Sequence, residues 1–496
     1  CHKGKNREGR RKMKNKKVSL LTLIPVISIL SGCNSLGSIV EPTFSSQDKV
    51  TFVAYAGPTV GSWNGVSKNV NTLTDEHYKK IADAGFNKII ALYEGASSET
   101  SSLEVTIENR AKKAEEHALI ALELAKKYNL EYYVRDWSFY GLTQPSGYCY
   151  SKGINSQEEV NRIIDKIFTD ENKYIHHSNY AGNFCYDEPT YDELENVSWE
   201  VNAYLERMKQ LNAEGEPLVN LLPIYASGKE HMGGFSYSQY LDRYIELIGK
   251  KIGYISYDFY PFLGGEGSYL RSQYLLNLQL TALKAKANNI ELRSFVQTKG
   301  DFTGLRDLTS IADFRFQVYT SLAFGSRNLT YYEYAGDKSA KDGEFALFNY
   351  YDGTYNYTYD LASQVNNEVH SFEDVLTSYD FDNVTYFNAN ELYDNQNFAN
   401  LVEYVDYFDR VKINSASEDT LLTSFKHKET NDDAFMLMNF TDPYENKIDE
   451  VTLKFNNAKG LLMYRFGQKM LVRLPSNGEY KFKLYPGEGR YLIPIK

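Results

Sequence analysis

The sequence predicts an α/β chain in which a (β/α)8 barrel, or TIM barrel, is followed by a C-terminal all-β sandwich. Strand patterns alternate with helical patterns eight times over about 330 residues, which favours a closed parallel sheet. Five of the eight expected strands end in a carboxylate. After about Tyr379 helical periodicity stops, and short alternating runs follow at a spacing of about ten residues, as in a β-sandwich.

Eight apolar runs supply the expected strands of the barrel, which we place at residues 50–380. They are 50–56, 86–93, 130–134, the stretch 182–189, 217–225, 252–257, 290–296 and 328–332. The expected helices are 74–84, 106–128, one from 156, one from 192 to about 211, 237–248, 269–287, 310–324 and 360–376. Thr74 and Ser156 are typical N-caps, and Glu159 completes a capping box with Ser156. Glycines close three of the helices, at positions 85, 249 and 325.

The fourth expected strand, Gly182-Asn183-Phe184-Cys185-Tyr186-Asp187-Glu188-Pro189, organises the barrel. Pro189 cannot donate to a sheet ladder, so the strand stops and delivers two adjacent carboxylates to the barrel rim. The alternative is that Asp187 only caps the next helix and Glu188 is only solvated. A doubly wound open sheet is the alternative fold, but the chain has no G-x-G-x-x-G after its first strand and no P-loop. Nucleotide binding therefore has no support, and we expect no cofactor.

The second domain is expected at residues 385–496. Its short runs are 421–426, 434–439, 451–455, 460–465, 469–474, 480–484 and 490–494. Such a sandwich either binds a ligand or shields the barrel.

Residues 1–33 are expected to be a basic leader and a lipoprotein signal peptide, with residues 34–49 as a tether. A basic start at Met13 precedes an apolar run at 18–30 that is too short for a comfortable membrane span. Leu30-Ser31-Gly32-Cys33 then resembles the lipobox of bacterial lipoproteins, in which the cysteine is acylated. The sequence therefore predicts lipidation of Cys33 and an anchor in the bacterial cell membrane, with the folded part outside the cytoplasm. An uncleaved anchor is the alternative.

Charge and cysteine content limit the classes of partner. Residues 1–32 hold 9 Lys and Arg and 1 acidic residue, so their loss takes the net charge from −11 to about −19. An acidic body repels nucleic acid, so no nucleic-acid partner is expected. Cys149 and Cys185 make neither a disulfide framework nor a metal pattern, and a bridge between them is left open. No metal site is expected.

The strand ends bring acids and aromatic rings to the C-terminal rim of the barrel. The acids and amide at these ends are Glu94, Asp136, Asp187, Glu188, Asp258, Gln297 and Glu333. The neighbouring aromatics are Tyr93, Trp137, Tyr186, Tyr260 and Tyr332. Glycoside hydrolysis needs one acid to protonate the leaving oxygen and a second carboxylate to attack or to activate water. Aromatic rings supply the floor for a sugar.

Several rim acids have a plainer alternative. Asp136 follows Arg135 and could form a simple ion pair, and Glu94 before a glycine could be a solvated loop acid. Asp258 precedes the aromatic stretch 259–262, which favours a place in the pocket. Glu333 lies between tyrosines, where loss of water would raise its pKa, as a general acid requires.

The chain resembles clan-A-type glycoside hydrolases, near the family 42 β-galactosidases and related bacterial lipoproteins. The resemblance rests on the stretches 182–189, Tyr-Asp-Phe-Tyr-Pro-Phe at 257–262, Arg-Phe-Gln-Val-Tyr-Thr-Ser-Leu-Ala-Phe-Gly at 315–325 and Leu-Tyr-Pro-Gly-Glu-Gly at 484–489. It implies that Glu188 is the acid/base, although the clan usually has Asn-Glu where this chain has Asp-Glu.

The resemblance fails at the seventh strand, where the clan carries a nucleophilic Glu and this chain has Gln297. Three consequences stay open. Asp258 or Glu333 serves as nucleophile or base, or the substrate supplies a 2-acetamido nucleophile that Gln297 or Asp258 orients, or the site only binds sugar.

Together these observations predict a surface-anchored glycoside hydrolase acting on an oligo- or polysaccharide. Glu188 is the expected general acid, with Asp258 or Glu333 as its partner. The residues expected to shape the sugar subsite are Asp187, Asp136, Trp137, Tyr260, Gln297 and Glu94. The alternatives are a non-catalytic carbohydrate-binding lipoprotein with a degenerate site and a structural envelope protein without a sugar site.

Overall fold

Eight parallel strands form a closed barrel in a computed structural model of the chain. The structure describes residues 42–58, 60, 72–96, 105–264, 269–300, 304–336, 346–350, 353–387 and 408–496. The barrel strands are β1 Thr51–Tyr55, β2 Lys88–Ile90, β3 Glu131–Val134, β4 Tyr180–Asp187, β5 Glu216–Asn220, β6 Tyr254–Tyr257, β9 Glu291–Gln297 and β10 Asn328–Tyr332. They pair in the order β5-β4-β3-β2-β1-β10-β9-β6, and a bridge between Leu221 and Tyr257 joins the two ends. The predicted fold class is confirmed.

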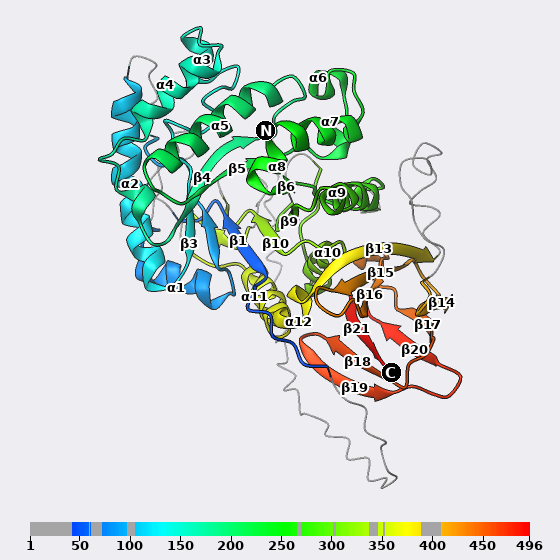
Figure 1. Cartoon of the computed structure of the whole chain (residues 1–496). Helices are drawn as coiled ribbons and strands as arrows, with labels where there is room; N and C mark the ends of the chain where they lie inside the picture. Colours follow the sequence, from blue (N-terminus) through cyan, green and yellow to red (C-terminus); the bar gives the residue numbers. More distant parts are fainter. Residues whose placement is uncertain are drawn as a thin grey trace, which may run out of the picture. The chain divides into compact units, whose positions relative to one another are not determined.

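Helices follow the strands and surround them (Figure 1). The helices of the barrel are α1 Asp75–Asp83, α2 Ile107–Lys127, α4 Gln157–Ile167, α5 Leu194–Gln210, α7 Tyr237–Tyr244, α8 Lys250–Ile252, α9 Tyr274–Asn288, α10 Ile311–Ala323, α11 Tyr357–His370 and α12 Glu373–Thr377. Two short helices, α3 Tyr148–Ser151 and α6 Lys229–Met232, lie in the loops. Most residues of the barrel strands are buried, including polar ones on β9, because both faces of each strand are covered.

Most helix ends lie close to the positions that the sequence predicts. Thr74 and Ser156 accept N-cap hydrogen bonds from the third residue of α1 and α4. Gly249 does not end its helix as predicted, because the chain continues through one π turn and α8 to Gly253, which has φ +84°. The helix predicted at 360–376 is two helices, α11 and α12, separated at Ser371–Phe372.

Strand β4 approaches β5 closely because it carries a glycine at the contact. A Cβ on Gly182 would lie 1.9 Å from the Glu216 carbonyl oxygen, and Gly182 has φ +146°. The strand ends at Asp187, and Glu188 turns out of it with φ +51°. The Glu188 N–H still donates to the Asn220 carbonyl at 2.8 Å. This bond fixes the position of Glu188 against the end of β5.

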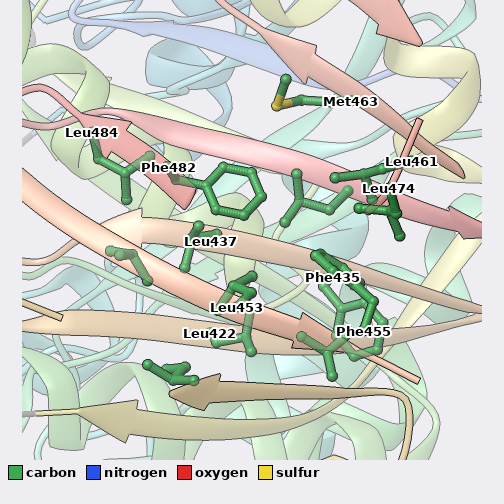
Figure 2. Close-up of a cluster of buried hydrophobic side chains, with 14 residues drawn as sticks. Leu422, Phe435, Leu437, Leu453, Phe455, Leu461, Met463, Leu474, Phe482 and Leu484 are labelled. Atoms are coloured by element: carbon green, nitrogen blue, oxygen red, sulfur yellow. The ribbon is translucent and has the colours of Figure 1, made fainter. Parts of the chain in front are cut away.

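The C-terminal domain is an antiparallel sandwich. Its strands are β13 Tyr379–Phe387, β14 Val411–Ser415, β15 Thr420–His427, β16 Asp433–Asn439, β17 Asp449–Phe455, β18 Gly460–Arg465, β19 Gln468–Arg473, β20 Glu479–Leu484 and β21 Gly489–Ile495. Six strands pair in the order β13-β15-β16-β21-β18-β19 and three in the order β14-β17-β20. Strand β13 crosses the expected boundary at 380–385, so the sandwich sheet begins at Tyr379. Figure 2 shows the apolar core between the sheets, including Phe435, Phe455 and Phe482.

A buried ion-pair cluster joins the barrel to the sandwich within the compact unit Val40–Lys496. Arg306, on the loop after β9, contacts both oxygens of Asp442 at 2.9 and 3.1 Å and Asp313 of α10 at 2.9 Å. Breaking a buried pair of this kind costs roughly 3–5 kcal/mol. The loop that follows β9 is therefore fixed from the sandwich side.

Two predictions concern residues at the start of the chain. Cys33 and the signal peptide 1–33 lie outside the described residues, as does the tether up to position 41. None of the helices in the described part of the chain is both long enough and apolar enough to span a bilayer.

Candidate active site

A cavity of about 430 Å³ opens at the C-terminal ends of β4, β5 and β6. Its lining residues are Tyr55, Asp187, Glu188, Asn220, Tyr225, Asp258, Tyr260, Arg271, Phe295, Leu305 and Tyr332. Active sites of barrel enzymes lie on this face. A larger cavity of about 660 Å³ lies at the opposite end of β9, where Lys286 neutralises the lining Asp382 at 2.8 Å. The smaller cavity is the candidate site because it collects three carboxyl groups, and two of them, Glu188 and Asp258, form no ion pair with a described residue.

Glu188 and Asp258 both line this cavity, and the charge of Asp258 acts on the Glu188 carboxyl group. The charge of Asp258, then burial, then the charge of Asp187 raise the pKa of Glu188 to about 9. Burial and the charge of Asp187 raise the pKa of Asp258 to about 7. Glu188 is exposed to solvent, whereas Asp258 is buried. The pair therefore holds a proton on Glu188 at neutral pH and presents it to the open side of the cavity.

Asp187 is the carboxylate whose charge raises the pKa of both Glu188 and Asp258. Burial raises its own pKa above the usual value for an aspartate, and Arg135, Asn220 and Tyr55 offset only part of this rise. The Tyr55 hydroxyl donates to Asp187 at 3.3 Å, and Arg135 lies 3.8 Å from the same oxygen. Arg135 also donates to Tyr55 at 2.9 Å. Tyr55 and Arg135 both stabilise the negative charge of Asp187 directly. Asp187 therefore stays ionised beside a protonated Glu188.

Asn220, at the end of β5, connects the acids of two strands. Its side-chain amide donates to Asp187 at 3.3 Å and to Asp258 at 3.0 Å. Its oxygen accepts from the Ser256 hydroxyl at 3.0 Å, which fixes the amide orientation. The sequence analysis missed this residue because it extended the strand to Tyr225. A lone asparagine inside the apolar run Leu218–Leu222 was the available signal.

Aromatic rings form one wall of the cavity. The Tyr332 ring lies 5.2 Å from Tyr260 and 5.3 Å from Tyr55, and Phe295 lies 5.8 Å from Tyr55, all between ring centroids. These strand-end rings present an apolar surface beside the acids. Flat apolar surface beside hydrogen-bonding groups suits a sugar ring.

Gln297 lies outside the cavity lining and is fully engaged with backbone. Its amide donates to the carbonyls of Lys299 at 3.1 Å and Arg306 at 3.0 Å, and its oxygen accepts from Phe262 N–H at 3.2 Å. The side chain is 1% exposed. The structure therefore gives Gln297 a place between loops and does not support the predicted contact with a sugar.

Glu333 does not join the acids of the cavity either. Its carboxylate forms a buried ion pair with Lys299 at 2.7 Å. A carboxylate held by a lysine is a poor proton donor, because the ammonium favours the ionised form. The predicted partnership of Glu333 with Glu188 is therefore not supported, and Asp258 is the predicted partner that the structure brings to Glu188.

Three other predicted subsite residues also lie outside the cavity lining. Glu94 is buried and accepts from the Tyr132 hydroxyl at 2.5 Å and the Arg135 N–H at 2.9 Å. Asp136 is buried and accepts from Ser138 N–H at 2.7 Å and the Tyr174 hydroxyl at 2.9 Å. The backbones of Glu94 and Asp136 form a bridge just beyond the ends of β2 and β3. Both side chains accept hydrogen bonds from buried donors at these strand ends. The simple Arg135–Asp136 ion pair is likewise not the arrangement found, since Arg135 lies against Asp187.

Trp137 is half-buried beside these acids. Its ring meets Tyr93 edge to face with centroids 5.2 Å apart. It does not line the cavity. Of the predicted site residues, the structure thus brings together Asp187, Glu188, Asp258 and Tyr260.

Neither a metal site nor a disulfide accounts for the cluster. Across the described ranges, no group of three or more His, Cys, Asp or Glu side chains is arranged to hold a metal ion. Cys149 and Cys185 are both buried free thiols. The Cys185 thiol donates to Glu200 at 3.3 Å, away from the cavity lining. The chemistry available at the cavity is therefore that of carboxyl groups, tyrosines and Arg271.

The arrangement supplies the two functions of acid-catalysed bond cleavage. A protonated Glu188 faces the open cavity. An ionised Asp187 directly precedes it in the chain. A neutral acid can donate to a leaving oxygen, and a nearby carboxylate can stabilise positive charge at carbon. Environment keeps the pKa values of the two apart, which is how paired carboxyl groups divide acid and base roles.

Comparison with solved structures supports the fold. A β-galactosidase from Bacillus circulans sp. alkalophilus is similar with a TM-score of 0.52 at 8% identity, over 90% of this chain and 99% of that one. A maltogenic α-amylase from Thermotoga neapolitana gives 0.46 at 11% identity, over 90% and 99% of the two chains. An endoxylanase from Clostridium papyrosolvens C71 gives 0.40 at 12% identity, over 91% and 98%. The structural neighbours are thus glycoside hydrolases, whereas closeness to family 42 stays a prediction. No protein-family model and no curated protein matches the chain.

Proposed function

We propose that the protein is a glycoside hydrolase in which Glu188 protonates the leaving oxygen of an oligo- or polysaccharide. The observation that carries this proposal is the Glu188–Asp258 pair, which raises the pKa of Glu188 to about 9 and keeps its proton at neutral pH. The aromatic wall and the glycoside hydrolase fold agree with a sugar substrate. Two carboxyl groups with similar pKa values could not divide the roles of proton donor and ionised carboxylate between them.

The other two acids have distinct roles in this proposal. Asp187, supported by Arg135, Tyr55 and Asn220, is the ionised carboxylate that faces the positive charge developing at the anomeric carbon. Asp258 is a positioning residue, because its charge acts on Glu188 and raises the pKa of that carboxyl group.

A hydrolysis screen tests the proposal. The full chain is incubated with aryl glycosides and natural oligosaccharides, with Glu188→Gln in parallel. A matched control is Glu195→Gln, which changes an acid on the surface of α5 that pairs with Arg243 at 3.5 Å. Turnover by wild type and Glu195→Gln, with loss in Glu188→Gln, is the expected result. Full activity of Glu188→Gln on a natural oligosaccharide, whose leaving group needs a proton, would remove Glu188 from the mechanism.

Sugar binding without turnover is the second candidate function. The observation that favours it is the end of β9, where Gln297 replaces a carboxylate and is held by three backbone groups. It predicts that wild type and Glu188→Gln are stabilised by the same sugars, while neither releases product. Thermal melting in the presence of each oligosaccharide separates the two functions.

Attachment to the cell membrane through Cys33 is also part of the proposal, and the lipobox-like sequence before Cys33 supports it. Labelled palmitate fed to expressing bacteria is expected to enter the wild-type protein and Cys149→Ser, and not Cys33→Ser. Equal labelling of all three proteins would contradict lipidation at this residue.

A further inference from the structure

Arg271 is a cation of the candidate cavity that is not matched to a carboxylate. It follows the short strand β8 Tyr269–Leu270, and its guanidinium lies 3.8 Å from the centre of the Tyr225 ring. Its Nε is buried without a hydrogen-bond partner. Among the described residues, its side chain makes no ion pair with an acid.

Four other arginines of the barrel do have such partners. The pairs are Arg135–Asp187, Arg293–Glu216, Arg306–Asp442 and Arg315–Glu368. A guanidinium presents a planar fork of donors that matches a carboxylate or a sulfate with two parallel hydrogen bonds. An arginine that lines a cavity without a carboxylate partner among the described residues can therefore bind an anionic group from outside the chain.

The cavity acids do not meet this need. Among the ion pairs and hydrogen bonds found between described residues, none joins Arg271 to Glu188 or Asp258, although all three line the cavity. The Tyr225 ring, against which Arg271 lies, lines the same cavity as the acids, and its pKa is raised by Asp258 and Glu188 and lowered by Arg271. The cavity thus holds a cation as well as the proton donor.

The position of Arg271 is fixed by its backbone. The Arg271 N–H donates to the Pro261 carbonyl at 2.8 Å, and β8 pairs with β7 Phe262–Leu263. Phe262 in turn accepts and donates to Gln297 at the end of β9. The cation is therefore carried by a short ribbon tied to the barrel.

We propose that the cavity selects a sugar with an anionic substituent, a uronate carboxylate or a sulfate ester, which Arg271 binds while Glu188 faces the scissile bond. This inference rests on the proposed hydrolase function. Because the chain carries a net charge of −11, an anionic sugar needs a local cation to approach the three acids. A neutral sugar would leave the fork of Arg271 unpaired.

Binding measurements on the full chain test the inference. The probes are the methyl glycosides of glucuronate, galacturonate and 6-O-sulfated N-acetylglucosamine, each in both anomers against its uncharged parent. Calorimetry is done in the Glu188→Gln background, because a methyl glycoside needs a general acid and is then not consumed. At least one anionic probe is expected to bind about 10-fold more tightly than its parent, in line with a charge-assisted pair. The carboxylate and sulfate arms show which anion is preferred.

Variants of Arg271 identify the group responsible. Arg271→Met, which keeps the side-chain volume and removes the charge, is expected to abolish the preference, and Arg271→Lys to retain part of it. Arg473→Met, a cation of the sandwich, is the matched control and is expected to change nothing. Melting temperatures establish that each variant is folded. An anionic probe that binds no better than its parent in every pair, or a preference that survives Arg271→Met, overturns the inference.

Failure of the proposed function would look different. A preference for anionic sugars that depends on Arg271, without turnover by wild type, would sustain the inference and remove the hydrolase. Turnover of neutral glycosides that depends on Glu188, with no anionic preference, would sustain the hydrolase and overturn the inference.

Discussion

Replacing Asn220 by alanine perturbs the two acids that it joins. The substitution removes the donor at 3.3 Å from Asp187 and the donor at 3.0 Å from Asp258. Both bonds lower the pKa of the acid that accepts them. A hydrogen bond to a charged group contributes roughly 1.5–3 kcal/mol, and 1.36 kcal/mol corresponds to one pKa unit, so each pKa is expected to rise by about 1–2 units.

The assay is the pH dependence of kcat/KM on a substrate found in the screen. Its acidic limb reports whichever of Asp187 and Asp258 must be ionised, so it is expected to move up by about 1–2 pH units in Asn220→Ala. Ser256→Ala is the control, because Ser256 contacts only the amide oxygen of Asn220 at 3.0 Å. Its limb is expected to move by less than about half a unit. An unmoved limb in folded Asn220→Ala would refute the role given to this amide.

Three further predictions concern single positions and pH. Gln297→Glu is expected to lower the melting temperature by several degrees without improving turnover, because a carboxylate would face backbone carbonyls that the amide now satisfies; a gain in rate would contradict this. Glu188→Gly is expected to abolish turnover and to raise the melting temperature slightly. Glutamate at φ +51° carries strain of roughly 1 kcal/mol, which glycine does not. A fall in melting temperature would argue against this strain. Burial raises the pKa of Glu200 to about 8 and of Asp136 to about 6. The unfolded chain releases these protons at a lower pH than the folded chain does, so the free energy of unfolding is expected to fall as pH rises from about 4 to 8. A melting temperature that stays constant over this range would exclude the effect.

Local sequence signals were enough to place most of the barrel. Caps such as Thr74 and Ser156 act within one turn, and apolar runs mark buried parallel strands in any order of the sheet. The end of β5 was misplaced because the apolar run continues past Asn220 to Leu222. Only the pairing with β4 and β6 decides where that strand stops.

The candidate site was predicted in part. Asp187, Glu188 and Asp258 are strand-end acids, and strand ends meet at one rim whatever the details of packing. The same rule also included Glu94, Asp136 and Glu333, which lie outside the cavity lining because each of them contacts a partner from another segment. Lys299 reaches Glu333 and Tyr132 reaches Glu94 only in the folded chain. A sequence shows which acids lie at the rim and does not show which are already neutralised.

The leaving-group dependence of Glu188→Gln tests the central claim most directly. A general acid is needed for an alkoxide leaving group and hardly at all for 2,4-dinitrophenolate, which departs without a proton. The account predicts that Glu188→Gln loses roughly 10²–10⁴-fold in kcat/KM on oligosaccharides and much less on the dinitrophenyl glycoside of the same sugar. An equal loss on both substrates, or no loss on the oligosaccharide, would contradict the assignment of Glu188 as the proton donor.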